Sequence, residues 1–383
     1  MSAAPGTGER ALGRDQVTTV LFTGGGTGGH LMPALAIAEE MVRLDPTVRP
    51  FFVGSRRGVE AGVLPQRPWP YELLPLEPLW RRRWWRNVRL PGALFASLRA
   101  VREMLGRERP ALVVGTGGYV AGPVVWAAMN RGVPAVLQEQ NAYPGLATRR
   151  LARRARQVHL GFPEARARLR VGPETAVFDS GNPIPPPPAP LPSPQASKRK
   201  LGFPDDRPLV FVTGGSQGAL PLNRAVAEAL ASRVFPAGVS LLWQCGASSL
   251  DQFVAFRASG LVAVEPFVDP VADAYAAADL VVSRAGAMTL AGLSAWGLPA
   301  ILVPLPTAAA GHQLSNARAL AQSGAAVLLQ QHELSGAALG GAVAGLLSDS
   351  ARMAGLRTRM LARARPDAAT TIASEALKVM WKT

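Results

Sequence analysis

Cysteine, acidic residues and long apolar runs are scarce in this sequence, and each shortage excludes a class of protein. With Cys245 as the single cysteine among 383 residues, no internal disulfide framework is available, and a reducing cytoplasm is the expected compartment. The longest uncharged stretch, residues 285–317, is interrupted by glycine and proline, so no transmembrane helix is expected. Residues 1–16 lack the apolar core of a signal peptide and are expected to form a flexible tail.

The shortage of acidic residues is uneven and leaves the first half of the chain strongly basic. The chain carries 41 Lys and Arg against 26 Asp and Glu, a net charge of +15. Residues 1–185 hold 25 Arg against 14 acidic residues, so most of the excess lies there. An anionic partner, either a nucleic acid or a membrane surface, is therefore expected for the first half. Asp-X-Asp, a carboxylate pair that would hold a catalytic metal, occurs nowhere, so no metal is expected.

One segment of the basic half interleaves tryptophan with arginine. Indole rings prefer the headgroup boundary of a membrane, and arginines attract anionic lipids. An amphipathic helix expected over residues 91–105, with Leu94, Leu98 and Val101 on one face, would continue the same surface. The composition also suits nucleic acid, but no nucleic-acid motif accompanies it, so no nucleic-acid partner is expected. The predicted membrane patch consists of Trp80, Arg81, Arg82, Arg83, Trp84, Trp85 and Arg86.

Among the features that are present, the most informative is a glycine-rich loop, Thr23–His30, between a strand-like and a helix-like run. Glycines let the backbone approach a ligand, and free N–H groups at a helix start favour negative charge, so the loop predicts phosphate binding. His30 ends the loop and places a proton acceptor beside whatever the loop holds. A dinucleotide site is the alternative, since three of the glycines satisfy its spacing. The usual acidic residue after the second strand is missing, which leaves an NADP-type site through Arg56.

Strand-like and helix-like runs alternate along the whole chain, which is typical of parallel α/β sheets. The Thr-Gly-Gly of the first loop returns at Thr213, after a proline-rich and basic stretch. The expected fold is therefore α/β, with two Rossmann-like domains facing each other across a cleft. The expected divisions are a tail at 1–16, an N-terminal domain at 17–184, an exposed linker at 185–200, a C-terminal domain at 201–368 and a helix at 369–383 that returns to the first domain.

Several short motifs occur in the order and spacing of a known family. They are Gly25–His30, Gly115–Tyr119, Glu139–Asn141, Gly181–Pro183, Gly214–Gly218, Arg284–Thr289 and His312-Gln313. Together they resemble the N-acetylglucosaminyltransferases that convert lipid I to lipid II in bacterial peptidoglycan synthesis, of the glycosyltransferase family 28 type. The resemblance covers nearly the whole chain from Val17 and implies the glycosyltransferase B fold. It also implies inverting transfer of GlcNAc from UDP-GlcNAc to the 4-hydroxyl of the muramoyl sugar of undecaprenyl-diphospho-MurNAc-pentapeptide.

The resemblance further implies which residues meet the substrates. The acceptor diphosphate is expected at Gly117, Gly118 and Tyr119, in the N-terminal domain. The implied donor-binding residues are Thr27, Gly28, Gly29, Asn141, Ser216, Val268, Ala287, Met288, Thr289 and Gln313. UDP-GlcNAc enters as donor substrate, with no cofactor. The implied partners are a polyprenyl-diphosphate-linked muramoyl-pentapeptide, an anionic membrane surface and a cell-wall synthesis complex, at the cytoplasmic face of the inner membrane.

Single displacement at an anomeric carbon needs a base for the acceptor hydroxyl and stabilisation of the departing UDP. His30 is the predicted catalytic base, and its alternative role is to cap the following helix or to position the acceptor. Without a metal, the leaving-group charge is expected to meet backbone N–H groups at Ser216 and at residues 287–289. Arg284 is expected either to assist them as a cation or to serve as a structural ion-pair residue.

Two positions depart from the family pattern. Position 185 is proline where the family has an arginine that holds the donor, and position 292 is glycine where the family has a glutamate for the ribose hydroxyls. These departures keep two alternatives open. One is another UDP-sugar enzyme of the same fold, such as a glycolipid glycosyltransferase or a UDP-GlcNAc 2-epimerase. The other is a degenerate, non-catalytic UDP-sugar-binding paralogue.

Overall fold

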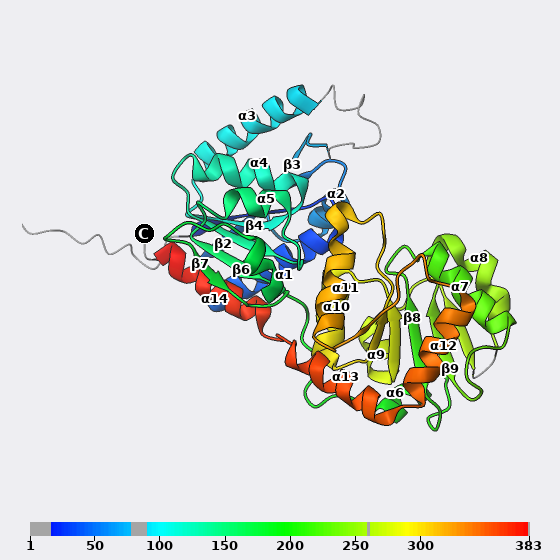
Figure 1. The fold of residues 1–383 in the computed structure, drawn as a ribbon. Helices are drawn as coiled ribbons and strands as arrows, with labels where there is room; N and C mark the ends of the chain where they lie inside the picture. The colour runs from blue at the N-terminus through cyan, green and yellow to red at the C-terminus, as the bar shows by residue number, and fades with distance from the viewer. Residues whose placement is uncertain (1–16, 78–89, 259–260, 382–383) are drawn as a thin grey trace, which may run out of the picture.

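The structure is a computed structural model that describes residues 17–77, 90–258 and 261–381. They form two domains, each built on a parallel sheet flanked by helices (Figure 1). The predicted α/β fold with two Rossmann-like domains is therefore confirmed. The predicted membrane patch at Trp80–Arg86 and the predicted tail at 1–16 lie outside the described residues.

The first sheet has seven parallel strands in the order β3-β2-β1-β4-β5-β6-β7. The strands are β1 Thr18–Gly24, β2 Val48–Ser55, β3 Tyr71–Leu74, β4 Leu112–Gly117, β5 Ala135–Glu139, β6 Gln157–Leu160 and β7 Ala176–Phe178. Its helices are α1 Gly28–Leu44, α2 Glu60–Val63, α3 Leu90–Glu108, α4 Gly118–Met129 and α5 Leu146–Leu151. The strands carry continuous apolar runs, such as Val20-Leu21-Phe22, because helices cover both faces of the sheet and bury them.

The second sheet has six parallel strands in the order β10-β9-β8-β11-β12-β13. The strands are β8 Leu209–Thr213, β9 Ser240–Gln244, β10 Val262–Glu265, β11 Leu280–Ser283, β12 Ala300–Leu302 and β13 Val327–Leu328. The helices after the first sheet are α6 Pro194–Lys200, α7 Leu220–Ala231, α8 Leu250–Phe253, α9 Val271–Ala277, α10 Ala287–Trp296, α11 His312–Gln322, α12 Gly336–Leu347, α13 Ser350–Ala362 and α14 Ala368–Trp381. In both sheets the strand order reverses beside the first strand, β1 or β8, which is where α/β folds of this kind bind ligands.

The last helix belongs to the core of the first domain. Ile372, Ala373 and Ala376 on α14 are fully buried among the side chains of β1 and α1. The Thr370 hydroxyl donates to the Glu40 carboxylate on α1 at 2.9 Å. Figure 1 shows α14, in red, along the N-terminal domain after it leaves the second domain. The chain therefore crosses between the domains twice, once after β7 and once after α13.

The linker predicted at 185–200 is only partly a linker, which corrects the sequence analysis. Residues 194–200 form α6, which begins with Pro194 and packs against α9. Lys198 on this helix is buried, and its ammonium pairs with Asp279 at 2.7 Å and donates to the Arg207 carbonyl at 2.7 Å. The sequence predicts exposure for the whole basic run at 198–200, because one buried lysine cannot be distinguished in it from its exposed neighbours.

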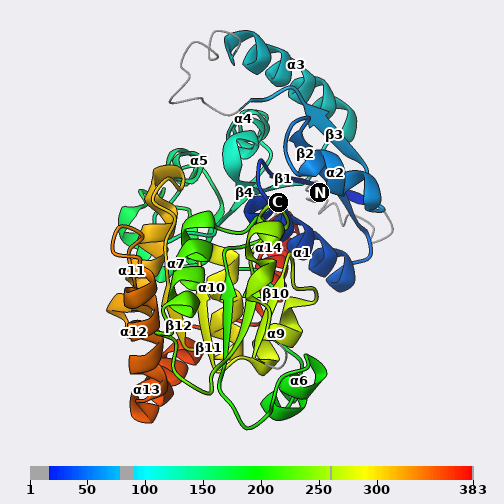
Figure 2. The same cartoon turned by 90° about the vertical axis from the view of Figure 1, so that its right-hand side faces the viewer.

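The helix predicted at 91–105 is α3, which lies at the end of the N-terminal domain remote from the second domain (Figures 1 and 2). Its predicted apolar face is divided between core and surface. Val101 is fully buried and Leu98 half-buried, whereas Leu94 is exposed and Phe95 beside it is 71% exposed. No helix within the described residues is long and apolar enough to cross a membrane.

Candidate active site

The two glycine loops of the N-terminal domain lie against each other at the carboxyl ends of the adjacent strands β1 and β4. The Gly25 N–H donates to the Gly117 carbonyl at 3.4 Å. A Cβ on Gly118, which has a φ of +80°, would overlap the carbonyl oxygen of Gly25. The glycine is therefore required twice at this position, once for its backbone conformation and once for the close approach of the loops.

His30, the predicted base, lies in the first turn of α1 where the two loops meet. Its Nδ1 lies 2.9 Å from the Thr27 hydroxyl oxygen, and the ring packs against Gly117, where a Cβ would lie 2.9 Å from its Cδ2. Burial and, to a smaller extent, the charge of His312 from the second domain together lower the pKa of His30 to about 4. The imidazole is therefore neutral at pH 7, and its Nε2 has no hydrogen-bond partner within residues 17–77, 90–258 and 261–381.

Only some N–H groups of the first loop are available to a phosphate, because others already have acceptors within the protein. The Gly25 and Gly26 N–H groups are bonded to the Gly117 carbonyl and the Glu60 carboxylate. The N–H groups of the next three residues make no hydrogen bond within the described part of the chain, namely Thr27, Gly28 and Gly29. They form the open N-terminus of α1, where an anion would be stabilised.

In the second domain, Gln244 at the end of β9 ties two of the predicted donor segments together. Its side-chain nitrogen donates to the Gly215 carbonyl at 2.9 Å, next to Ser216, and its oxygen accepts the Val268 N–H at 2.9 Å. Ser216 and Val268 are therefore held at the same sheet edge. The N–H groups at Ala287, Met288 and Thr289 open α10 and have no intrahelical acceptor, so they form a second open helix N-terminus.

The remaining predicted donor residues meet where the domains touch, around Asn316 on α11. Asn316 is fully buried; its oxygen accepts the Ala142 N–H at 2.8 Å, and its nitrogen donates to Asn141 at 3.1 Å and to the Ala285 carbonyl at 3.2 Å. It thus links Asn141 of the first domain to the loop that precedes α10. One turn earlier, the Gln313 oxygen accepts the Leu305 N–H at 2.9 Å, which leaves the two N–H groups of its amide for a ligand.

A second bridge between the domains is made by His312, the first residue of α11, whose Nδ1 lies 3.0 Å from the Tyr143 carbonyl oxygen. The α11 helix extends from the second domain toward the first in both views (Figures 1 and 2). His312 belongs to one of the sequence motifs but has no predicted role, and Asn316 is not among the predicted residues. The only signal for Asn316 was its spacing of three residues from Gln313, which places both on one face of a helix.

Arg284 is held by hydrogen bonds within the second domain, and it makes no ion pair with the residues that the structure describes. Its guanidinium is buried and donates to the Val303 carbonyl at 2.9 Å and to the Gln331 side chain at 2.7 Å. Burial lowers the pKa of Arg284. These bonds direct the guanidinium to the segments that follow β12 and β13. At Gly292, a Cβ would lie 3.2 Å from the ring of Tyr275.

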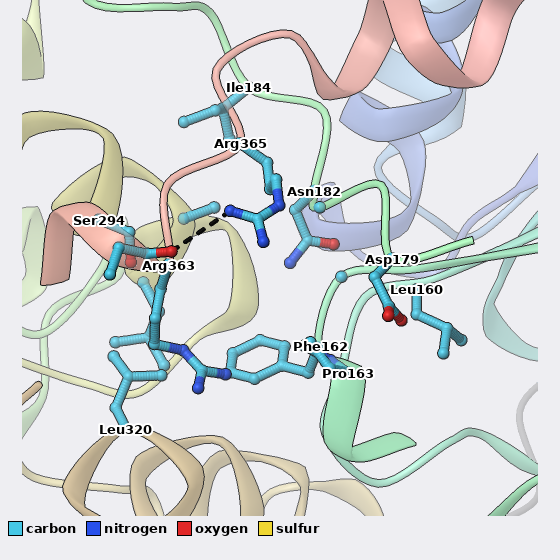
Figure 3. A pocket seen from close by; sticks show the side chains of 15 residues that line it. Leu160, Phe162, Pro163, Asp179, Asn182, Ile184, Ser294, Leu320, Arg363 and Arg365 are labelled. Carbon is cyan, nitrogen blue, oxygen red and sulfur yellow. Dashed lines mark hydrogen bonds between the residues drawn. The ribbon is translucent and has the colours of Figure 1, made fainter. Parts of the chain in front are cut away.

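A cavity of about 150 Å³ lies at the hinge and away from these residues. Figure 3 shows Arg363 beside the ring of Phe162, with Arg365 and Asn182 on the opposite side. Arg363 is 5.6 Å from the Phe162 ring and pairs with Glu164 of the first domain through two hydrogen bonds of 2.9 and 3.0 Å. None of the predicted substrate residues lines this cavity. The cavity lies between the two segments in which the chain crosses from one domain to the other.

Among the described residues, no cluster of three His, Cys, Asp or Glu side chains could hold a metal ion.

Comparison with known proteins agrees with this arrangement of loops. Residues 20–160 match the description "Glycosyltransferase family 28 N-terminal domain", and residues 209–372 match "Glycosyltransferase family 28 C-terminal domain". The chain belongs to glycosyltransferase family 28. It is 40% identical over 368 residues to a UDP-N-acetylglucosamine--N-acetylmuramyl-(pentapeptide) pyrophosphoryl-undecaprenol N-acetylglucosamine transferase of Desulforudis audaxviator, covering 92% of this chain and 96% of that relative. A Salinibacter ruber protein of the same name is 40% identical and is covered to 96%.

The same relationship appears in three dimensions. The fold of this transferase superposes on a crystal structure of Acinetobacter baumannii MurG with a TM-score of 0.75 and 26% sequence identity. The match covers 94% of this chain and 99% of the other. The glycosyltransferase B fold implied by the sequence motifs is therefore confirmed, and the protein is a glycosyltransferase.

Proposed function

We propose that this glycosyltransferase moves GlcNAc from UDP-GlcNAc to the 4-hydroxyl of the muramoyl sugar of undecaprenyl-diphospho-MurNAc-pentapeptide, with inversion at the anomeric carbon. The name shared by its relatives supports the substrates. The observation that carries the chemistry is the position of His30: a neutral imidazole with a free Nε2, at the contact of two anion-binding loops and beside His312 of the donor domain.

In the proposed reaction His30 Nε2 takes the proton of the acceptor hydroxyl as that oxygen attacks the anomeric carbon. The Thr27 hydroxyl next to Nδ1 fixes the orientation of the ring. The acceptor diphosphate binds at Gly117, Gly118 and Tyr119 and at the open N-terminus of α1. The resemblance also gives Thr27, Gly28 and Gly29 of that N-terminus as donor contacts, so the GlcNAc of the donor is proposed to lie against them. The uridine diphosphate binds between Ser216, Val268 and the N-terminus of α10, with Asn141 and Gln313 at the sugar.

Negative charge builds up on the UDP oxygen as its bond to the sugar breaks. The free N–H groups at the start of α10 supply hydrogen bonds and the positive end of a helix dipole to that oxygen. In this proposal backbone dipoles stabilise the charge, and the reaction needs no metal cofactor. The domain around the first sheet thus serves the acceptor, and the domain around the second sheet serves the donor.

The surface that meets the membrane is proposed to be the outer end of the N-terminal domain, on the cytoplasmic face of the membrane. Phe95 on α3 is 71% exposed, Trp126 on α4 is 43% exposed, and Leu146 on α5 is 62% exposed. These helices pack side by side, and the tryptophan–arginine segment immediately precedes α3 in the sequence. Exposed apolar side chains beside arginines suit an anionic lipid surface. Sedimentation with anionic vesicles tests this: Phe95→Asp should reduce binding, whereas Leu191→Asp, at a 51% exposed leucine of the linker, should not.

The reaction is tested by transfer of radiolabelled GlcNAc from UDP-GlcNAc to a short-chain analogue of the lipid acceptor, with EDTA present. Product supports the donor, the acceptor and independence of metal together. Product that appears only when Mg²⁺ replaces EDTA would overturn the metal-free chemistry. Detectable UDP-GlcNAc binding without product would overturn the proposed acceptor and favour a non-catalytic binder, in keeping with the absence of a carboxylate at Gly292.

A further inference from the structure

A carboxylate is buried beneath the first glycine loop, and the reaction as described does not use it. Glu60 opens the short helix α2 and is completely buried. Its Oε1 accepts the Gly26 N–H at 2.9 Å and the Ser55 N–H at 3.1 Å. Its Oε2 has no hydrogen-bond partner in the described part of the chain. A buried carboxylate oxygen without a partner is costly, so this side chain is unusual for a residue that only fills space.

The backbone around Glu60 leaves room for this carboxylate and for little else. A Cβ on Gly25 would overlap Oε1, and a Cβ on Gly58 would overlap Oε2. A Cβ on Gly54 would lie 2.7 Å from the Glu60 Cβ. Three glycines therefore enclose the side chain, one from strand β2, one from the turn after it and one from the loop that carries the open N-terminus of α1.

Glu60 is also connected to the second glycine loop by a closed series of contacts. The Ser55 hydroxyl lies 2.7 Å from the Tyr119 hydroxyl, and the Tyr119 ring covers Gly26, where a Cβ would lie 2.5 Å from its Cε1. The contacts thus run from Glu60 to Gly26, on to the Tyr119 ring, through its hydroxyl to Ser55, and back to Glu60. Burial raises the pKa of Tyr119, and the charge of Glu60 raises it further, so the hydroxyl keeps its proton for this bond.

We infer that Glu60 is a positioning residue that fixes the two N-terminal glycine loops relative to each other, so that their free N–H groups fit one acceptor diphosphate. This inference rests on the function proposed above. By accepting the Gly26 N–H, the carboxylate holds the turn at which Gly26 adopts a φ of +89°. The Thr27, Gly28 and Gly29 N–H groups follow directly on this turn. Glu60 itself touches no substrate.

The experiment compares four variants in the transfer assay, with UDP binding measured separately by calorimetry. Glu60→Ala leaves two buried N–H groups without an acceptor, and we expect the KM for the lipid analogue to rise roughly tenfold or more, about 1.4 kcal/mol or above. Glu60→Gln keeps an oxygen for both N–H groups and should restore the KM to within about threefold of wild type. The Kd for UDP should stay unchanged in both, because the uridine diphosphate is proposed to bind between Ser216, Val268 and α10, all in the other domain. Glu228→Ala is the control for loss of a carboxylate that accepts a backbone N–H, since the exposed Glu228 accepts the Gly336 N–H at 2.9 Å in the second domain.

Ser55→Ala provides the test if Glu60→Ala does not fold. It removes the bond to the Tyr119 hydroxyl while keeping the Ser55 N–H for Glu60, and it should raise the acceptor KM with the Kd for UDP unchanged. The inference is overturned if the UDP and acceptor constants change together, if Glu60→Gln is as impaired as Glu60→Ala, or if neither Glu60→Ala nor Ser55→Ala changes the acceptor KM.

Failure of the proposed function is distinguishable from failure of this inference. If the wild type gives no product, the acceptor assignment fails, and amide hydrogen exchange in segments 17–31 and 112–129 still reports on the loops. Faster exchange in both segments of Glu60→Ala, reversed in Glu60→Gln, supports the positioning role. Exchange equal to that of the wild type refutes it, whatever the substrate.

Discussion

The pH dependence of turnover is the sharpest test of His30 as the base. Burial lowers its pKa to about 4, and the neighbouring charge of His312 contributes to the shift. A base accepts a proton only when neutral, so kcat/KM should stay level above this pKa and fall tenfold per pH unit below it. We therefore expect a plateau from about pH 8 down to about pH 5. An unperturbed histidine would already lose half of the activity near pH 6.5.

Two variants make the test specific to this ring. His30→Ala should lower kcat by roughly 10²–10⁴, the usual contribution of a general base. His312→Gln removes a like charge, which raises the pKa of His30 and moves the acid limb of kcat/KM to higher pH. His332→Gln, at an exposed histidine of the second domain, serves as the control and should leave the profile unchanged.

The same assay yields a second comparison from the kcat profile, which reports the enzyme–substrate complex. Bound diphosphate places negative charge near the imidazole and favours its protonated form. The acid limb of kcat should therefore lie at higher pH than that of kcat/KM. An acid limb of kcat/KM at pH 6.5, or near-normal turnover by folded His30→Ala, would refute the role of His30 as a partly buried, neutral base.

Three further results are expected. Thr27→Val removes the bond to His30 Nδ1 and should lower kcat roughly 5- to 10-fold, about 1–1.5 kcal/mol, whereas Thr27→Ser should retain most activity; equal loss in both would contradict the orienting bond. His159 is fully buried and its pKa is lowered to about 3, so the unfolded chain binds a proton below pH 6.5 that the folded chain refuses. Stability should therefore fall with decreasing pH by up to about 1.4 kcal/mol per unit, and urea unfolding of His159→Gln at pH 7.5 and 5 should show a smaller fall. Glu164→Gln weakens the partly exposed ion pair with Arg363 at the hinge. Urea unfolding should show a loss of no more than about 1 kcal/mol in the free energy of unfolding, and a much larger loss would mean that the hinge depends on this pair.

Much of the fold was predictable because the decisive residues are local. A strand buried on both faces shows itself as a continuous apolar run, and a glycine loop after it marks the start of a helix; both hold at Thr23–His30 and at Thr213–Gly218. The helix α6 was missed because its burial depends on a partner, Asp279, that lies about 80 residues away in the sequence. Propensity and composition carry no information about such a partner.

The site was predictable to the extent that its groups belong to the backbone of a motif. Glycine loops and helix starts can be recognised from the local sequence, so the candidate segments at residues 27–29, 117–119 and 287–289 could be predicted. Glu60 and Asn316 could not, since each acts through bonds to segments distant in the sequence, such as Gly26 for the former and Ala142 for the latter. The role of a buried polar residue follows from its hydrogen-bond partners, and these are known only once the chain is folded.

These buried side chains divide the proposed reaction between the two domains. On the acceptor side, Glu60 consumes the Gly26 N–H and thereby fixes the loop beside which His30 must meet the hydroxyl. On the donor side, the N–H groups at the start of α10 remain open for the charge that develops on UDP. Asn316 bonds both to Ala285, just before that helix, and to Asn141 of the first domain. Base and leaving-group stabiliser sit on separate rigid sheets, so their separation is set by this junction. Rotation of the domains about the hinge would therefore disrupt proton removal and leaving-group stabilisation together.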